Sequence, residues 1–224
     1  MCGRLTRHYT WAELVRLYRL TSTPANIQPS YNVCPTDTVD TVLVRNGSRV
    51  LAPMRWGLVP WHWKKPLKAL KLATFNARVE TVATKPMFRD AFKRHRCLIP
   101  ASGYYEWEDT PDGKQPHYFT ARDGSPVLTM AGLWDEWKNI ETKERLLSCT
   151  MIITEPNRYV AEVHDRMPVI LRPEQFGAWL DGALGIDDIK APITDDYLRR
   201  QRVSRRVNSS RARNDDSTLI NEAA

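Results

Sequence analysis

Apolar and polar residues alternate over several short stretches of the chain, and this pattern predicts a protein rich in β-strands. The stretches Val39–Val44 and Arg49–Met54 flank Asn46-Gly47, a residue pair typical of tight hairpin turns. A second hairpin is predicted from His117–Ala121 and Pro126–Gly132, with its turn at the Asp-Gly pair between them. Hairpins of this kind predict antiparallel strand pairs.

The signals for helices are fewer and shorter. Thr10 and Glu13 have the spacing of a capping box, which predicts a helix that begins there and runs to about Tyr18. Three more helices are predicted at Pro86–His95, Asn157–Val163 and Pro173–Leu180, and one buried strand is predicted at Leu146–Thr154. Because strands outnumber helices and do not alternate with them, we predict an α+β fold with mixed, mostly antiparallel sheets.

Length and composition indicate one intracellular domain. The chain has 224 residues, with no internal repeat, no linker and no apolar run long enough for a membrane helix, so residues 1–224 are expected to form a single domain. The four cysteines, Cys2, Cys34, Cys97 and Cys149, form no C-x-x-C pair, which argues against a zinc site or a disulfide framework. We expect no metal, no cofactor and no membrane partner. A monomer is expected because no helix shows a dimer seam.

Positive charge is concentrated near the C-terminus. The formal net charge is +7, and seven arginines without an intervening acid lie between positions 199 and 213. These are Arg199, Arg200, Arg202, Arg205, Arg206, Arg211 and Arg213. A stretch of this kind fits an anionic polymer as partner, but it equally fits a solvated, partly disordered terminus.

The second residue has the most distinctive chemistry in the chain. If Met1 is removed, Cys2 presents an α-amine and a thiol on adjacent carbons, with ordinary pKa values of about 7.7–8.0 and about 8.5. Such a 1,2-aminothiol can attack acyl groups through sulfur, or it can condense with an aldehyde and close to a thiazolidine ring. The alternative is an ordinary Met-Cys start without a role.

Three further polar positions interrupt apolar segments. Asn76 can donate and accept a hydrogen bond, and Arg78 is expected on the same face of an extended strand. Glu106 lies among aromatic residues, where desolvation raises a carboxyl pKa into the range of a proton shuttle. His164 can act as acid or base, with Arg166 nearby for a phosphate. Each of these positions also has an ordinary structural explanation, but with Cys2 they describe a site for a phosphate-bearing carbonyl substrate.

Tryptophan adds a possible nucleic-acid surface. Trp56, Trp61 and Trp63 precede Lys64-Lys65, and aromatic faces interleaved with cations suit single-stranded nucleic acid. The alternative is that these tryptophans are part of the core.

Four ordered motifs resemble one known family. Met-Cys-Gly-Arg stands at 1–4, Phe-Asn-Ala-Arg-Val-Glu at 75–80, Arg-Cys-Leu-Ile-Pro-Ala-Ser-Gly-Tyr-Tyr-Glu-Trp at 96–107 and His-Asp-Arg-Met-Pro-Val-Ile-Leu at 164–171. In this order they resemble the SOS-response-associated peptidase (SRAP) family, which includes the 5-hydroxymethylcytosine-binding, embryonic-stem-cell-specific protein of animals. The similarity extends into the basic C-terminal segment 199–224, through Val207-Asn208 and Arg213-Asn214-Asp215. That segment is therefore expected to belong to the domain.

The resemblance implies a fold and an activity. The fold would be α+β, with an open, barrel-like set of strands flanked by short helices. Members of the family remove their own Met1, and Cys2 then forms a thiazolidine crosslink with the ring-opened deoxyribose of an abasic site in single-stranded DNA. The crosslink shields the lesion. The protein would act in the cytoplasm or on the nucleoid of a bacterium, or in the nucleus of a eukaryote.

The resemblance also implies roles for individual residues. Asn76 would contact the reacting sugar or the N-terminal residue, Glu106 would shuttle a proton, and His164 would assist ring opening and crosslink release. Other side chains would contact DNA, either at phosphates or by packing: Arg4, Trp63, Arg78, Trp107 and Arg166. Some members carry a phosphate-binding arginine near position 85, and in this chain Lys85 is expected to contact DNA in its place.

Two other functions start from the same residues. N-terminal-nucleophile glutamine amidotransferases also begin Met-Cys-Gly and use Cys2 as an acyl acceptor, although such domains usually accompany a synthetase or transferase domain. A non-covalent reader of single-stranded DNA would leave Cys2 without a chemical role. Met1 removal is expected to be autocatalytic, although an ordinary methionine aminopeptidase could make the same cut.

Overall fold

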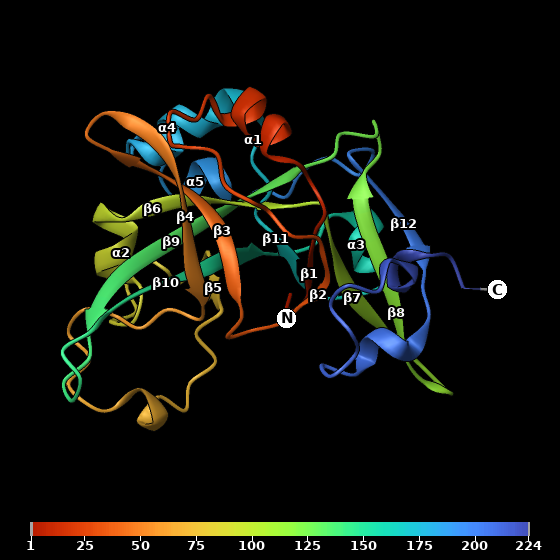
Figure 1. The fold of residues 1–224 in the computed structure, drawn as a ribbon. Coiled ribbons are helices and arrows are strands. Elements are labelled where there is room, and N and C mark those ends of the chain that lie inside the picture. The colour runs from red at the N-terminus through yellow and green to blue at the C-terminus, as the bar shows by residue number, and fades with distance from the viewer. Residues whose placement is uncertain (1, 224) are drawn as a thin grey trace.

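A closed ring of five strands forms most of the larger of two sheets in a computed structural model, which describes residues 2–223 (Figure 1). The ring is formed by strands in the order β10, β4, β3, β6 and β9, and it closes because β9 also pairs with β10. Their bounds are β3 Thr38–Arg45, β4 Ser48–Trp56, β6 Arg96–Ala101, β9 Leu128–Lys138 and β10 Arg145–Thr154. The predicted α+β class with mostly antiparallel sheets is confirmed, and the barrel is closed by hydrogen bonds rather than open.

Two short strands extend the ring at β10. The antiparallel partner β11 is Met167–Pro168, and the parallel partner β5 is Asn76–Arg78. In the β5 pairing Asn76 lies opposite Met151, so the β10 backbone holds the segment that contains Asn76 and Arg78.

A second, five-stranded sheet packs beside the ring. Its order is β12-β8-β7-β1-β2, and it lies to the right of the ring in Figure 1. The strands are β1 Leu5–Arg7, β2 Ser30–Val33, β7 Gly103–Thr110, β8 Gly113–Ala121 and β12 Leu198–Arg202. β1 pairs with both β2 and β7, so the residues just before β1 are led in between two strands of this sheet.

The helices are short, and two of them pack against the ring strand β6. Their bounds are α1 Trp11–Tyr18, α2 Arg89–Arg94, α3 Arg158–Ala161, α4 Phe176–Leu180 and α5 Ile186–Ile189. The capping box predicted at Thr10 and Glu13 is confirmed, because each residue's side chain accepts from the other's backbone N–H. The helix predicted over Pro86–His95 is shorter than expected, since Pro86 to Phe88 form turns and α2 begins at Arg89. No helix formed by residues 2–223 is long and apolar enough to cross a membrane.

One predicted hairpin is confirmed and the other is wrong. Asn46 and Gly47 have φ of 50° and 74° and join β3 to β4, as the tight turn requires. β8 and β9, by contrast, do not pair: β8 pairs with β7 and β12, whereas β9 pairs with β6 and β10. The Asp123-Gly124 turn therefore connects two different sheets, which local sequence signals do not specify.

The Arg-rich C-terminal segment is folded onto the five-stranded sheet. Val203, Val207 and Leu219 are buried and pack with Tyr105 and Tyr118. Most of its arginines are already engaged, through the pairs Arg200–Glu162, Arg202–Glu108, Arg206–Asp216 and Arg213–Asp215. These contacts contradict a solvated, disordered terminus and reduce the charge available to an anionic polymer. We propose on this basis that the segment belongs to one domain spanning the chain.

Leu219→Ala tests this packing. Leu219 is 1% exposed, so its truncation leaves a cavity and is expected to lower the free energy of unfolding by about 2–4 kcal/mol. Urea denaturation measures the loss. Leu72→Ala is the matched control, because Leu72 is 66% exposed and its truncation removes little packing. A Leu219→Ala protein as stable as the control would show that the segment contributes nothing to the fold.

Candidate functional site

Cys2 is held in the interior at the entrance to β1. It is 1% exposed and belongs to the largest buried apolar cluster. The side-chain amide of Asn76 donates a 2.9 Å hydrogen bond to the Cys2 carbonyl oxygen. Because β5 is fixed against β10, this bond ties the N-terminal segment to the ring. Two of the sequence-predicted residues, 74 positions apart, are thus in direct contact.

Glu106 lies on β7 in the same buried region. It is 1% exposed, and neither carboxylate oxygen has a hydrogen bond of ordinary geometry with the described residues. Burial raises the pKa of Glu106 to about 7, while the neighbouring Cys2 thiol lowers it in part. The carboxyl group is therefore divided between its acid and base forms near neutral pH, which suits proton transfer in either direction.

His164 faces the carboxyl group of Glu106. Its Nε2 lies 3.7 Å from Glu106 Oε2. On the other side of the ring, the Arg166 backbone N–H donates to Nδ1 at 3.1 Å, and Asp165 Oδ1 lies 3.1 Å from the same nitrogen. Partial burial lowers the pKa of His164, which favours a neutral imidazole at pH 7. The hydrogen bond that Nδ1 accepts from the Arg166 backbone N–H thus directs Nε2 at the carboxylate.

The Cys2 thiol stays protonated in this environment. Burial raises its pKa well above the ordinary value, and the nearby Glu106 carboxylate raises it further. A thiolate therefore forms only if a neighbouring group accepts the proton as the thiol reacts. Glu106, with a pKa of about 7, is the nearest titratable side chain suited to that transfer.

Arg4 and Trp107 form a second group beside Cys2. The Arg4 guanidinium lies over the Trp107 ring, 5.6 Å from its centroid, and donates to Asn32 Oδ1 and, at 2.7 Å, to the Val207 carbonyl oxygen. The indole N–H of Trp107 donates to Asn208 Oδ1 at 2.7 Å. The C-terminal segment therefore orients both side chains.

The other side chains predicted to contact DNA differ in their exposure, their ion pairs and their location. Arg78 and Lys85 are exposed and make no ion pair within residues 2–223. Arg166 forms an ion pair with Glu80, so a phosphate would have to compete with that carboxylate. Trp63 contacts Pro66 and Trp137 instead of the residues around Cys2. Its indole N–H donates to the Pro66 carbonyl oxygen, and its own carbonyl oxygen accepts from the indole N–H of Trp137.

Sequence patterns did not identify the residues that support Arg4 and Trp107. Asn32 lies in β2, and no spacing in the sequence connects it to Arg4. Asn208 belongs to the Val-Asn pair noted in the C-terminal segment, but nothing in the sequence places it next to Trp107. Both contacts join positions far apart in the chain, so only the fold reveals them.

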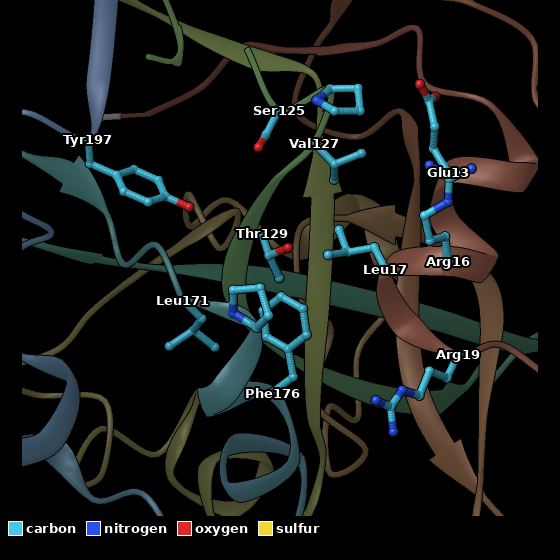
Figure 2. Close-up of a pocket in the computed structure, with 12 residues that line it drawn as sticks. Glu13, Arg16, Leu17, Arg19, Ser125, Val127, Thr129, Leu171, Phe176 and Tyr197 are labelled. Carbon is cyan, nitrogen blue, oxygen red and sulfur yellow. The ribbon is translucent and has the colours of Figure 1, made fainter. Parts of the chain in front are cut away.

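A separate cavity lies away from these groups. It has a volume of about 400 Å³ and is lined mainly by apolar side chains, including Leu17, Leu171 and Phe176. Figure 2 shows Tyr197 and α1 on opposite sides of it. None of the sequence-predicted site residues line it. Within residues 2–223, no group of three or more His, Cys, Asp or Glu side chains is arranged to hold a metal ion.

Comparisons with known proteins decide the family. The model of the SOS response associated peptidase (SRAP) family matches residues 1–210. The chain belongs to the SRAP family. The abasic site processing protein YoqW of Bacillus subtilis is 34% identical to it over 216 residues, which cover 93% of this chain and 95% of YoqW.

Two other proteins match part of their length or share the fold. The abasic site processing protein HMCES of Xenopus tropicalis is 34% identical over 181 residues, which are 69% of this chain and 54% of HMCES. A crystal structure of a Bacteroides thetaiotaomicron protein superposes over the full length of both chains, with a TM-score of 0.87 at 22% identity. That likeness confirms the fold.

The raised pKa of Glu106 predicts that Glu106→Gln increases the free energy of unfolding by an amount that depends on pH. Ionising the buried carboxyl disfavours the folded state, so this cost grows as the pH rises from 4.5, the unfolded-state value, to about 7. The glutamine variant cannot ionise. It is expected to be more stable than wild type at pH 8, by about 3 kcal/mol, and to lose that advantage near pH 4.5.

Urea unfolding of wild type and Glu106→Gln at the two pH values measures the difference in their free energies of unfolding. Intact mass first shows that both proteins begin with the same residue. Glu108→Gln is the control, because hydrogen bonds with His117 and Arg202 lower the pKa of Glu108. That substitution should not stabilise the protein at pH 8. Equal stability of Glu106→Gln and wild type at pH 8 would contradict a raised pKa.

Proposed function

We propose that this protein processes abasic sites in single-stranded DNA by forming a covalent thiazolidine crosslink through Cys2. One observation supports this most strongly: the thiol of Cys2 is buried against a carboxyl group whose pKa is about 7. Family membership and the names of the relatives, abasic site processing proteins, point to the substrate.

Removal of Met1 has to come first. In the full chain the nitrogen of Cys2 is part of the Met1–Cys2 peptide bond and is not nucleophilic. Hydrolysis of that bond uses one water, releases methionine and exposes the α-amine. We assign this cut to the protein itself, with Cys2 as the nucleophile, in keeping with the peptidase in the family description.

The crosslink then follows from ordinary aldehyde chemistry. The α-amine attacks C1′ of the ring-opened deoxyribose, and the carbonyl oxygen takes up a proton to give a carbinolamine. Glu106 in its acid form protonates this hydroxyl, which leaves as water, and the nitrogen then gives its remaining proton to neutral His164 to leave an imine. The thiol sulfur adds to the imine carbon while its proton passes to the nitrogen, so the ring closes with water as the only by-product.

Each neighbouring side chain has a role in these reaction steps. Asn76, which already holds the Cys2 carbonyl oxygen, positions the N-terminal residue. His164, whose Nε2 faces Glu106, returns the proton to the carboxylate and assists opening of the sugar ring and crosslink release. Both roles depend on separations that the fold fixes before the substrate binds.

DNA binding is assigned to the surface around Cys2. Arg78 and Lys85 are exposed cations for phosphates, and Arg4 and Arg166 are cations closer to Cys2 that also have protein partners. Trp107 provides an aromatic face for a base. Trp63 contributes a more distant packing surface. A crosslink formed here would shield the abasic site from strand cleavage.

Cys2→Ala is expected to abolish crosslinking and to retain DNA binding. Alanine removes the sulfur that closes the ring but leaves the phosphate contacts intact. Intact mass spectrometry and denaturing gels with an abasic single-stranded oligonucleotide report covalent capture, while an undamaged oligonucleotide reports binding. Cys34→Ser is the control, because Cys34 is a free, half-buried cysteine outside the reaction.

Three results would contradict the proposal. A wild-type complex that dissociates in detergent indicates a non-covalent reader. Glutamine hydrolysis that is lost in Cys2→Ala indicates an amidotransferase-like enzyme. Wild-type levels of crosslinking by Cys2→Ala exclude the thiazolidine.

Arg78→Ala is expected to weaken DNA binding in a salt-dependent manner. If Arg78 neutralises one phosphate of a single strand, its loss reduces the slope of log Kobs against log salt by about 0.7. Titrations at several salt concentrations measure the slope. Arg213→Ala is the control, since Arg213 is paired with Asp215 on the C-terminal segment. Identical slopes for the two variants would remove Arg78 from the DNA-binding surface.

A further inference from the structure

Buried hydrogen-bonding atoms without a partner are concentrated around Cys2. Eight such side-chain atoms occur within residues 2–223, and five of them belong to Arg4, Asn76, Tyr104 and Glu106. A buried polar atom that lacks a partner destabilises the folded state, so native structures contain few of them. Their concentration at one place indicates that a polar ligand supplies the missing bonds there.

Tyr104 is the member of this group without a role so far. It lies on β7 two residues before Glu106, so the two side chains project from the same face of the strand. Its ring is 0% exposed and stacks on Phe119 with 5.0 Å between the ring centroids. On the other side, Leu5 of β1 pairs with Tyr104, so the backbone that follows Cys2 runs alongside. The hydroxyl is therefore held in place near Cys2 and Glu106.

Comparison with the other buried tyrosines shows that this arrangement is unusual. Five tyrosines are buried within residues 2–223: Tyr9, Tyr18, Tyr104, Tyr105 and Tyr118. Four hydroxyls have partners, namely Asp40 for Tyr9, Thr129 for Tyr18, the Tyr31 carbonyl for Tyr105 and Thr6 for Tyr118. The hydroxyl of Tyr104 alone has none among the described residues. Among the described residues, the fold thus provides a hydrogen-bond partner for every buried tyrosine hydroxyl except the one at the proposed reaction site.

We propose that the Tyr104 hydroxyl is a substrate-binding group, which donates a hydrogen bond to the oxygen on C1′ of the ring-opened sugar. This inference rests on the proposed function and adds one residue to it. As the amine attacks C1′, the carbonyl oxygen gains negative charge, and a donor held beside it stabilises that charge. Glu106 still supplies the proton with which the oxygen leaves as water, and Tyr104 keeps its own proton throughout.

The protonation state of Tyr104 agrees with a donor role. Burial raises the pKa of its hydroxyl well above the ordinary value, and the nearby Cys2 and Glu106 raise it further. The phenol is therefore neutral over the whole pH range in which the amine and thiol react. Its contribution to the rate should not vary with pH, unlike that of Glu106.

Tyr104→Phe and Tyr105→Phe form a matched pair of tests. Each removes one buried hydroxyl from adjacent positions of β7, but only Tyr105 has a protein partner, 2.8 Å away. Single-turnover crosslinking to an abasic single strand at saturating DNA should be about tenfold slower in Tyr104→Phe, because one hydrogen bond to the transition state is lost. The rate should be unchanged in Tyr105→Phe. Melting temperatures should show the reverse: unchanged or higher in Tyr104→Phe and lower in Tyr105→Phe.

The outcomes separate this inference from the proposed function. A Tyr104→Phe rate equal to wild type overturns the role of Tyr104 while crosslinking itself stands. Equal slowing in both variants, or a lower melting temperature in Tyr104→Phe, also overturns it, since the hydroxyl would then serve the fold. A wild-type protein that forms no crosslink overturns both proposals. A tenfold loss that is constant between pH 6 and pH 9 supports the assignment.

Discussion

The burial of one carboxyl group beside one thiol is the constraint on which the rest of the structure depends. Glu106 and Cys2 are each 1% exposed, and an ionised carboxylate at such a position is costly unless it is paired. The carboxyl group therefore retains its proton up to about pH 7, and the thiol retains its own. Both groups are held in forms that can exchange a proton with a substrate near neutral pH.

The two-sheet architecture makes this arrangement possible. Glu106 lies on the five-stranded sheet and Asn76 on the strand attached to the ring, while Cys2 lies where the chain enters β1 between them. The C-terminal segment completes the site from outside, because Val207 and Asn208 orient Arg4 and Trp107. Arginines that look like a polyanion-binding tail in the sequence mostly form ion pairs within the protein, with Glu162, Glu108 and Asp216 among the partners.

Local signals in the sequence predicted local structure well. The Asn46-Gly47 turn and the capping box at Thr10 depend only on neighbouring residues, and both are present. The hairpin at Asp123-Gly124 is wrong because its two strands belong to different sheets, a choice made by long-range pairing. The grouping of Cys2 with Glu106 could be inferred from resemblance to a family, but not from residue spacing. Neither Asn32 nor the unpartnered hydroxyl of Tyr104 has any signal in the sequence, since only packing reveals what a side chain lacks.

The pKa of Glu106 is the quantity that tests this account most directly. It can be measured by following the side-chain carboxyl carbon of Glu106 by ¹³C NMR between pH 3 and pH 9, with Glu106→Gln to assign the resonance. A titration midpoint near 7 is expected, well above the ordinary 4.5. A midpoint near 4.5 would show that the carboxyl group is solvated and ionised at neutral pH, and would contradict the proposed proton transfer at Cys2.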